Sequence, residues 1–316
     1  MTTKKIAFLF PGQGSQTVGM GRSLAEQFPV AAATFAEADA ALGFPLSRIF
    51  LDGPEDELRL TENTQPAILT VSVAAWRVLA EHGVKPAMAA GHSLGEWSAH
   101  VAAGTLSFRD AVRAVKARGK SMQNAVPAGE GAMAAILAMS ADTVTELCAE
   151  VAAETGLVVS AANFNSPDQT VISGAKAAVE KAGELAKARG ARKVVMLAVS
   201  APFHCALMQP AQDDVAKGLA ETALADPAIP VAANVSGTLV TSADATRSAL
   251  IEQVTGTVRW VGCVQALLGA GAELFAEVGP GKVLTGLLRQ IDRSQKCFHV
   301  EDVASLEKAI LEISAT

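Results

Sequence analysis

The sequence contains no tyrosine, and phenylalanine and tryptophan together make up only 4% of its 316 residues. Half of the chain is nevertheless apolar, so its core must be built mainly from aliphatic side chains. This composition is typical of a helix-rich α/β protein. The length allows one large domain, or a large domain that carries a smaller insert.

Long hydrophobic runs and cysteine motifs are also missing. The apolar run at residues 6–10 stops at Pro11-Gly12, which makes it too short for a secretion signal or a membrane span. The chain has neither a CxxC pair nor zinc-finger spacing, and its four cysteines are Cys148, Cys205, Cys263 and Cys297. We therefore expect a cytoplasmic protein with free thiols, no membrane partner and no bound metal.

Positive charge is in short supply, since the formal net charge is -6. Nucleic-acid binding requires a basic surface that neutralises phosphates, so nucleic acid is not expected as a partner. A local basic patch could still bind a phosphate-bearing substrate or an acidic carrier protein.

Strands and helices alternate through most of the chain. Apolar runs predict strands at residues 6–10 and 87–90, and two mostly apolar segments predict strands at 231–235 and 274–278. Helical periodicity predicts helices at 66–81, 94–103, 108–124, 245–254 and 283–290, with Pro66 in a first helical turn and a capping box at Ser107–Asp110. This alternation favours an open, mostly parallel sheet, and thus a large α/β-hydrolase-like domain.

A second pattern follows the chain break at residues 127–131. Strands are predicted at 132–137, 158–163, 170–173 and 193–199, helices at 141–153 and 177–188, and a turn at 165–168. The order βαββαβ is that of a ferredoxin-like unit. We therefore predict a large catalytic domain formed by residues 1–127 and 200–316, and a small inserted ferredoxin-like domain at 128–199.

Ser93 is the candidate nucleophile, because Gly91-x-Ser93-x-Gly95 follows a predicted strand and precedes a predicted helix. This is the context of a nucleophile elbow, in which flanking glycines permit a tight turn and the hydroxyl lies at a helix N-terminus. There the free N–H groups and the helix dipole stabilise negative charge. The alternative is an ordinary turn in which Ser93 caps the helix.

His204 is the candidate base, because it follows a strand and Pro202 in a loop where catalytic groups are often displayed. A buried histidine satisfied by backbone groups is the alternative. The remaining histidines have simpler explanations. His82 suits a helix cap, and His92 should point away from Ser93. His100 suits a surface position on its helix, and His299 suits a strand.

No acidic third member of a triad is evident. Asp142 and Asp168 lie between the serine and the histidine in the chain, but both suit helix-start and turn roles in the predicted insert. An ordinary hydrolase would place Asp or Glu in this interval. The sequence therefore argues against an ordinary hydrolase, although a thioesterase or lipase-like enzyme and a non-catalytic scaffold remain alternatives.

Arg118 is the candidate substrate ligand. It aligns with Ala111, Val115 and Met122 on the apolar stripe of its helix. A cation on a buried face needs an anionic partner, which is either an internal carboxylate or an anionic group of the substrate. A guanidinium pairs with a carboxylate through two parallel hydrogen bonds.

Six segments in this order resemble the malonyl-CoA:acyl carrier protein transacylases of fatty acid synthesis, over essentially the whole chain. They are FPGQGSQ at 10–16, GHSLGE at 91–96, RGK at 118–120, FH at 203–204, VRW at 258–260 and EVGPG at 277–281. The resemblance implies that Ser93 carries the malonyl group as an ester and that His204 acts as general base and then as general acid. It also implies that a backbone carbonyl of Gln253 orients the histidine.

The same resemblance implies the remaining roles. Backbone N–H groups of Gln13 and Leu94 would form the oxyanion hole, Arg118 would hold the malonyl carboxylate, and Asn163 would line the thioester channel. Phe203 beside the histidine favours malonyl over methylmalonyl. The partners would be malonyl-CoA and an acyl carrier protein, whose phosphopantetheine thiol accepts the group in ping-pong order, with no cofactor. We expect a monomer, and a polyketide or malonate-decarboxylation pathway is a further alternative.

Overall fold

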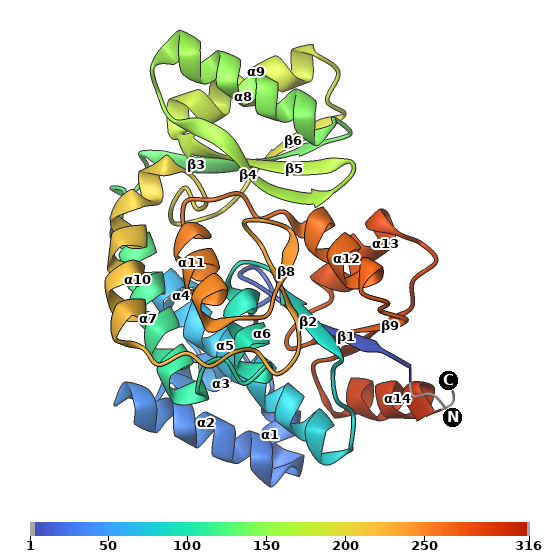
Figure 1. Ribbon diagram of the computed structural model, residues 1–316. Coiled ribbons are helices and arrows are strands. Elements are labelled where there is room, and N and C mark those ends of the chain that lie inside the picture. The colour runs from blue at the N-terminus through green and yellow to red at the C-terminus, as the bar shows by residue number, and fades with distance from the viewer. Residues whose placement is uncertain (1–3, 315–316) are drawn as a thin grey trace.

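Six strands form the larger of two sheets in the computed structural model, which describes residues 4–314 (Figure 1). In spatial order they are β10 (Cys297–Val300), β9 (Leu274–Val278), β1 (Ile6–Phe10), β2 (Met88–Gly91), β7 (Val231–Ala233) and β8 (Thr238–Val240). All neighbouring pairs are parallel except β7 and β8, which pair in antiparallel fashion. This confirms the predicted mostly parallel sheet.

Strand β1 shows why its sequence is continuously apolar. Ile6, Phe8 and Phe10 contribute to the core on one face of the sheet, while Ala7 and Leu9 contribute to the core on the other. Strands of a parallel sheet that is covered on both faces are nearly continuous apolar runs, because both sets of side chains are buried. The side with Ala7 and Leu9 is packed against α12 (Trp260–Gly269) and α13 (Val283–Ile291).

Most of the other helices cover the face with Phe8. They are α1 (Arg22–Gln27), α2 (Pro29–Leu42), α3 (Leu46–Asp52), α4 (Glu55–Arg59), α5 (Thr61–Glu81), α6 (Leu94–Ala102), α7 (Phe108–Asn124), α10 (Gln209–Glu221), α11 (Ala243–Glu252) and α14 (Val303–Ser314). A short 3₁₀ turn, Ala206–Met208, precedes α10. Ser107 caps α7 as predicted, because its hydroxyl oxygen accepts a hydrogen bond from the Asp110 N–H.

The second sheet has four strands, all antiparallel, in the order β4 (Val159–Ser166), β5 (Gln169–Ala175), β3 (Gly131–Leu137) and β6 (Lys193–Met196). Helices α8 (Ala141–Thr155) and α9 (Lys176–Ala188) cover its outer face, at the top of Figure 1. This arrangement has the strand order of a ferredoxin-like unit and confirms the fold class. The domain boundaries themselves stay a prediction.

Backbone hydrogen bonds at Val258 attach the small sheet to the large part of the chain. Its N–H donates to the Ala162 carbonyl at 2.8 Å, and its carbonyl accepts from the Phe164 N–H at 2.9 Å. Together they form a parallel bridge between Val258 and Asn163 of β4. The edge of the small sheet is thereby attached to the segment that follows α11.

Several predicted bounds were wrong. Helix α5 begins at Thr61 and contains Pro66 in its interior, because burial of most of the helix outweighs the one hydrogen bond that proline cannot make. Strand β4 extends into the first half of the predicted turn, to Ser166, and β5 begins at Gln169, which leaves only Pro167-Asp168 as the turn. Strand β6 ends at Met196 rather than at residue 199.

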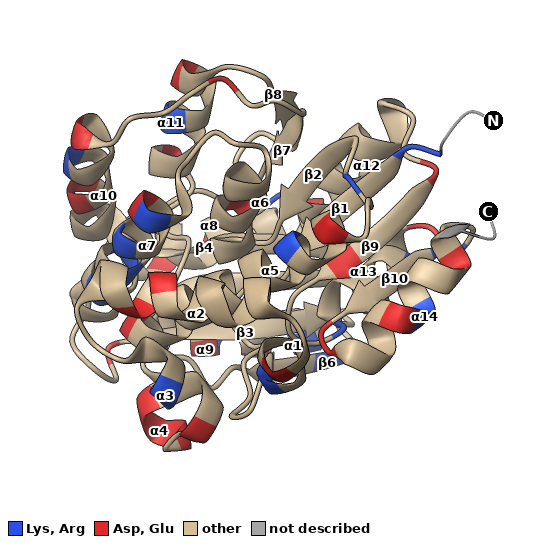
Figure 2. Ribbon diagram, turned by 90° about the horizontal axis from the view of Figure 1, so that it is seen from below, with Lys and Arg blue, Asp and Glu red and all other residues tan. Residues whose placement is uncertain are grey.

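Charged residues of both signs are interspersed along the helices in the view of Figure 2. Within residues 4–314, no helix is both long and apolar enough to cross a membrane.

Candidate active site

Ser93 lies in the turn from β2 to α6, at the carboxyl end of an inner strand of the large sheet. Its backbone has φ 51° and ψ -106°, a conformation that residues with a β-carbon rarely adopt. Such strain of about 1–3 kcal/mol persists only where neighbouring groups enforce it. Ser93 makes no capping hydrogen bond to α6 within the described structure. The turn thus has the geometry of a nucleophile elbow rather than of an ordinary capped helix.

Glycines around the elbow let three backbone segments approach closely. A β-carbon at Gly95 would lie 2.0 Å from the carbonyl oxygen of Phe10, and one at Gly91 would lie 1.9 Å from the backbone of Gly95. A β-carbon at Gly12 would lie 2.4 Å from the His92 carbonyl oxygen. The glycine-rich loop after β1 and the elbow after β2 therefore interlock only because these positions lack side chains.

Gly95→Ala is accordingly expected to destabilise the protein by at least about 3 kcal/mol, because the obstructing atom is rigid backbone. Gly286→Ala is the matched control, since Gly286 lies in helix α13 and its added β-carbon would meet no atom within 4 Å. The control should stabilise the helix by about 0.5–1 kcal/mol. Urea unfolding of both variants measures the difference, and a Gly95→Ala protein as stable as the control would contradict this reading.

Two buried amide side chains hold the elbow in place. Asn234, just after β7, accepts from the Ser93 N–H at 2.7 Å and donates to the Gly91 carbonyl at 2.8 Å. Gln253 donates from Nε2 to the Ser93 carbonyl at 2.9 Å. The strained backbone of Ser93 is therefore bonded at both its N–H and its carbonyl.

The hydroxyl of Ser93 is bonded to a histidine. Ser93 Oγ lies 2.8 Å from His204 Nε2, and His204 Nδ1 lies 2.8 Å from the carbonyl oxygen of Gln253. A carbonyl only accepts, so the proton of the neutral imidazole is on Nδ1 and Nε2 is free to accept the serine proton. Gln253 directly follows α11, where helix carbonyls lack intrahelical donors.

His204 is kept neutral by its surroundings. Burial and, to a smaller extent, the positive charge of Arg118 together lower its pKa to about 3, although the hydrogen bond that it donates to the Gln253 carbonyl opposes this shift. The unprotonated imidazole that a general base requires is therefore the form present at neutral pH. His204 also has positive φ, at 60°, so both members of the pair are held in unusual backbone conformations.

Arg118 lies in the same site, with only 1% of its surface exposed. Its Nη1 donates to Gln65 Oε1 at 2.7 Å, and its Nη2 donates to Gln253 Oε1 at 2.9 Å and to Ser93 Oγ at 3.2 Å. Among the described residues no carboxylate oxygen lies within 4 Å of it. Burial lowers its pKa to about 10, so Arg118 stays charged at neutral pH. An anionic group of a substrate at Ser93 would meet a cation that lacks a close ion pair.

Gln13 and Leu94 are the two residues whose N–H groups were expected to form the oxyanion hole. Leu94 is the first residue of α6, so its N–H is among those that a helix leaves without an intrahelical acceptor. Gln13 is positioned by its side chain, which donates to Thr61 Oγ1 at 3.2 Å. Both residues line the cavity that contains Ser93 and His204.

This cavity of about 130 Å³ lies between the two sheets. Met133 and Asn163 reach it from β3 and β4 of the small sheet, and Phe203 from the loop that carries His204. The structure thus brings all seven predicted site residues to one place: six line the cavity, and Gln253 supports it from beneath.

Sequence reasoning missed three polar residues of this site: Gln65, Glu96 and Asn234. Asn234 follows strand β7 and so lies at the carboxyl edge of a parallel sheet, where ligands bind, which could have marked it. Two other histidines lie in surroundings that the sequence did not predict. His100 is buried rather than at the surface, and His92 binds Asn165 through Nε2 at 2.8 Å.

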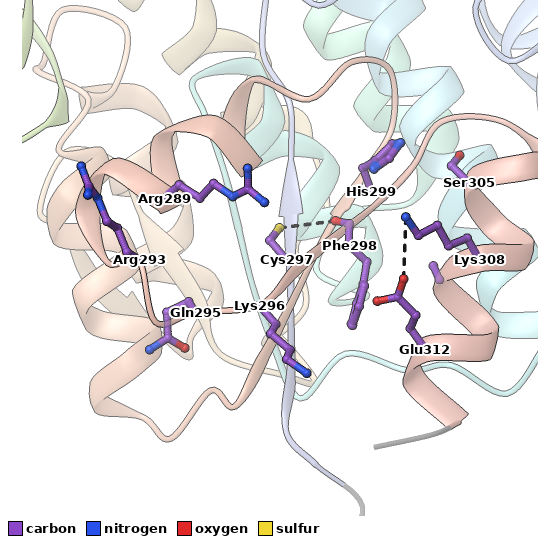
Figure 3. Close-up of a pocket in the computed structure, with 11 residues that line it drawn as sticks. Arg289, Arg293, Gln295, Lys296, Cys297, Phe298, His299, Ser305, Lys308 and Glu312 are labelled. Carbon is purple, nitrogen blue, oxygen red and sulfur yellow. Dashed lines mark hydrogen bonds and ion pairs between the residues drawn. The ribbon is translucent and has the colours of Figure 1, made fainter.

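A second cavity, of about 370 Å³, lies beside β10 between α13 and α14 (Figure 3). Its lining is rich in cations: Arg289, Arg293, Lys296 and Lys308. The thiol of Cys297 in its wall bonds to the Phe298 carbonyl, and burial raises its pKa to about 12. That thiol is protonated and is a poor nucleophile, so the cavity with Ser93 is the candidate active site.

Comparison with known proteins agrees with this geometry. Residues 7–309 match the family model described as acyl transferase domain. The malonyl CoA-acyl carrier protein transacylase of Escherichia coli K12 is 52% identical over 288 residues, covering 91% of this chain and 93% of that protein. The chain belongs to the malonyl CoA-acyl carrier protein transacylase family. This confirms the resemblance that the six sequence segments indicated.

Solved structures agree with the transacylase assignment. An acyl carrier protein S-malonyltransferase from Vibrio cholerae has a TM-score of 0.94 and 49% identity, covering 97% of this chain and all of that chain. A malonyl-transacylase solved in complex with a type II PKS acyl-carrier protein has a TM-score of 0.94 and 47% identity, covering 98% and 100%. The fold of this transacylase is therefore that of its relatives along nearly its full length.

Proposed function

We propose that this transacylase transfers a malonyl group from malonyl-CoA to the phosphopantetheine thiol of an acyl carrier protein, through an ester on Ser93. The names of its relatives support malonyl as the group and the carrier protein as the acceptor. The observation that carries the mechanism is the arrangement of Ser93 Oγ, which lies 2.8 Å from His204 Nε2 and 3.2 Å from Arg118 Nη2. The serine oxygen thus contacts both a general base and a cation that can bind the carboxylate of the malonyl group.

The first half-reaction acylates the serine. His204 Nε2 takes the proton from Ser93 Oγ as the oxygen attacks the thioester carbonyl, and the Gln253 carbonyl stabilises the imidazolium that forms. The carbonyl oxygen becomes negative and is bound by the N–H groups of Leu94 and Gln13. The carbon–sulfur bond then breaks, and His204 returns the proton to the sulfur of coenzyme A.

The second half-reaction repeats these steps in reverse with another thiol. His204 takes the proton from the phosphopantetheine sulfur, the sulfur attacks the malonyl ester, and the proton returns to Ser93 Oγ. A ping-pong order follows because both thiols use the same position. Asn163 and Phe203 line the space around the thioester, and the bulk of Phe203 disfavours a methyl branch on the acyl group.

Mass spectrometry of the acyl-enzyme tests this proposal. After incubation with malonyl-CoA, a malonyl adduct on the peptide with Ser93 is expected within seconds, with much less adduct from methylmalonyl-CoA and acetyl-CoA. Addition of a phosphopantetheinylated carrier protein should then discharge the adduct to the carrier rather than to water. The proposal fails if no malonyl adduct forms on Ser93, or if free malonate is the main product.

A serine hydrolase is disfavoured by one feature. The group on His204 Nδ1 is a neutral backbone carbonyl, whereas the hydrolase alternative called for an Asp or Glu. The proposal also includes the expectations of a cytoplasmic monomer, of two domains divided at residues 127/128 and 199/200, and of catalysis without a metal or organic cofactor.

A further inference from the structure

Glu96 is a carboxylate inside the catalytic site that the mechanism above does not use. It lies in the first turn of α6, three residues after Ser93, and none of its surface is exposed. Its Oε2 accepts hydrogen bonds from Gln253 Nε2 at 2.6 Å and from the Asn234 N–H at 3.0 Å. Its Oε1 has no hydrogen-bond partner among the described residues. A buried acid with one unsatisfied oxygen calls for a reason.

The side chain of Gln253 connects this acid to Arg118. Its Oε1 accepts from Arg118 Nη2 at 2.9 Å, while its Nε2 donates to Glu96 at 2.6 Å. The anion and the cation thus lie at opposite ends of one amide. They interact through the buried interior, where charges attract more strongly than in water.

The other titratable groups around Glu96 carry no charge at neutral pH. Burial raises the pKa of the Cys263 thiol of α12 and lowers those of His204 and His100 to about 3, and that of His92 is also lowered by burial. Glu96 and Arg118 are therefore the pair whose charges must balance. Burial raises the pKa of Glu96 to about 7, opposed by its two hydrogen bonds and by Arg118, so a proton is readily gained or lost.

We propose that Glu96 is the internal counter-ion of Arg118 in the free enzyme and takes up a proton from solvent when the malonyl carboxylate reaches Arg118. Keeping two carboxylates ionised near one buried cation costs free energy, so one of them takes up a proton. Glu96 is the one that is neutralised, because it has no direct hydrogen bond to Arg118. The proton returns to solvent when the malonyl group leaves. Glu96 is thus a positioning residue that makes malonyl binding pH-dependent, an inference that rests on the proposed role of Arg118.

The pH dependence has a definite sign. Below the pKa of about 7, Glu96 is already protonated and malonyl binding needs no proton. Above it, each pH unit should weaken malonyl-CoA binding by about tenfold, since a proton must be taken up from solvent. Acetyl-CoA has no second carboxylate, so its binding should not take up a proton.

Isothermal titration calorimetry measures the proton directly. The Ser93→Ala protein, which cannot turn over, is titrated with malonyl-CoA at pH 8 in phosphate and in Tris, two buffers with different ionisation enthalpies. About 0.9 proton should be taken up per malonyl-CoA, because Glu96 is then about nine-tenths ionised in the free protein. Acetyl-CoA should give no uptake.

Glu96→Gln in the same background is the matched variant, since the glutamine oxygen can keep both hydrogen bonds while the charge is lost. It should show no proton uptake and should bind malonyl-CoA about tenfold more tightly at pH 8 than the Ser93→Ala protein. Uptake that persists in Glu96→Gln, or no uptake with Glu96 present, would overturn the inference.

Arg118→Ala distinguishes a failure of the proposed role of Arg118 from a failure of the proposed role of Glu96. If it leaves the preference for malonyl-CoA over acetyl-CoA unchanged, the proposed role of Arg118 fails. If the preference depends on Arg118 but no proton is taken up, only the role of Glu96 fails. The titration of the Ser93→Ala protein alone decides the case even if Glu96→Gln does not fold.

Discussion

Ser93→Ala is expected to abolish the malonyl-enzyme and to reduce malonyl transfer by on the order of 10⁴- to 10⁶-fold, the range found when a serine nucleophile is removed. The covalent ester requires Oγ, and no other hydroxyl among the described residues is bonded to His204. The strained backbone at Ser93 is held by Asn234 and Gln253 rather than by the hydroxyl, so the variant should fold. Rates of transfer from malonyl-CoA to the carrier protein measure the effect.

Two further variants serve as controls for Ser93→Ala. Ser98→Ala, in the same helix α6, removes a buried hydroxyl that has no hydrogen-bond partner in the described chain, and it should leave transfer unchanged. His204→Ala should lose nearly as much activity as Ser93→Ala, and the double variant little more, because the two residues act as one unit. Fully additive losses would contradict a shared step.

Arg118→Ala should lower kcat/KM for malonyl-CoA by about 30- to 5,000-fold, which corresponds to the 2–5 kcal/mol typical of a buried charged pair. Transfer of acetyl groups should increase, because an uncharged acyl group no longer faces a buried cation at Ser93 Oγ. Parallel kinetics with malonyl-CoA and acetyl-CoA give both numbers from one preparation.

Arg109→Ala is the control for this substitution. It removes the same side chain from an exposed position of the same helix α7, and it should change neither rate. If Arg118→Ala lowered both rates equally, the arginine would support the fold of the site rather than recognise the malonyl carboxylate. If malonyl transfer persisted unchanged, Arg118 would have no role in the reaction.

The sequence was sufficient to predict the main architecture. The bounds of β1 and β9 were predicted correctly, because strands covered on both faces are almost wholly apolar. The exception is Glu277 of β9, which is buried and bonded to the backbone of α13. The start of α5 was wrong because Pro66 suits a first helical turn, and the burial that overrides this preference is a tertiary effect. Strand β8 was missed altogether, since it is short and lacks an apolar run.

The site was predictable to the extent that each residue carries its own chemistry. Arg118 was found because a cation interrupts an apolar stripe, and Ser93 because glycines flank it. Glu96 lacked such a signal, because a carboxylate in a first helical turn is usually explained by the helix dipole. Its burial comes from Asn234 and Gln253, which lie far away in the sequence and approach it only in the folded chain.

The bridge between Asn163 and Val258 has a consequence for building chimaeras of this enzyme. Only a short stretch separates Val258 from Gln253, whose carbonyl orients His204. The small sheet and the support of the base therefore behave as one mechanical unit, although they are distant in sequence. A chimaera that imports residues 131–196 from a relative should import residues 253–258 with them. A mismatch between β4 and Val258 would otherwise shift the Gln253 carbonyl and so misplace the imidazole of His204.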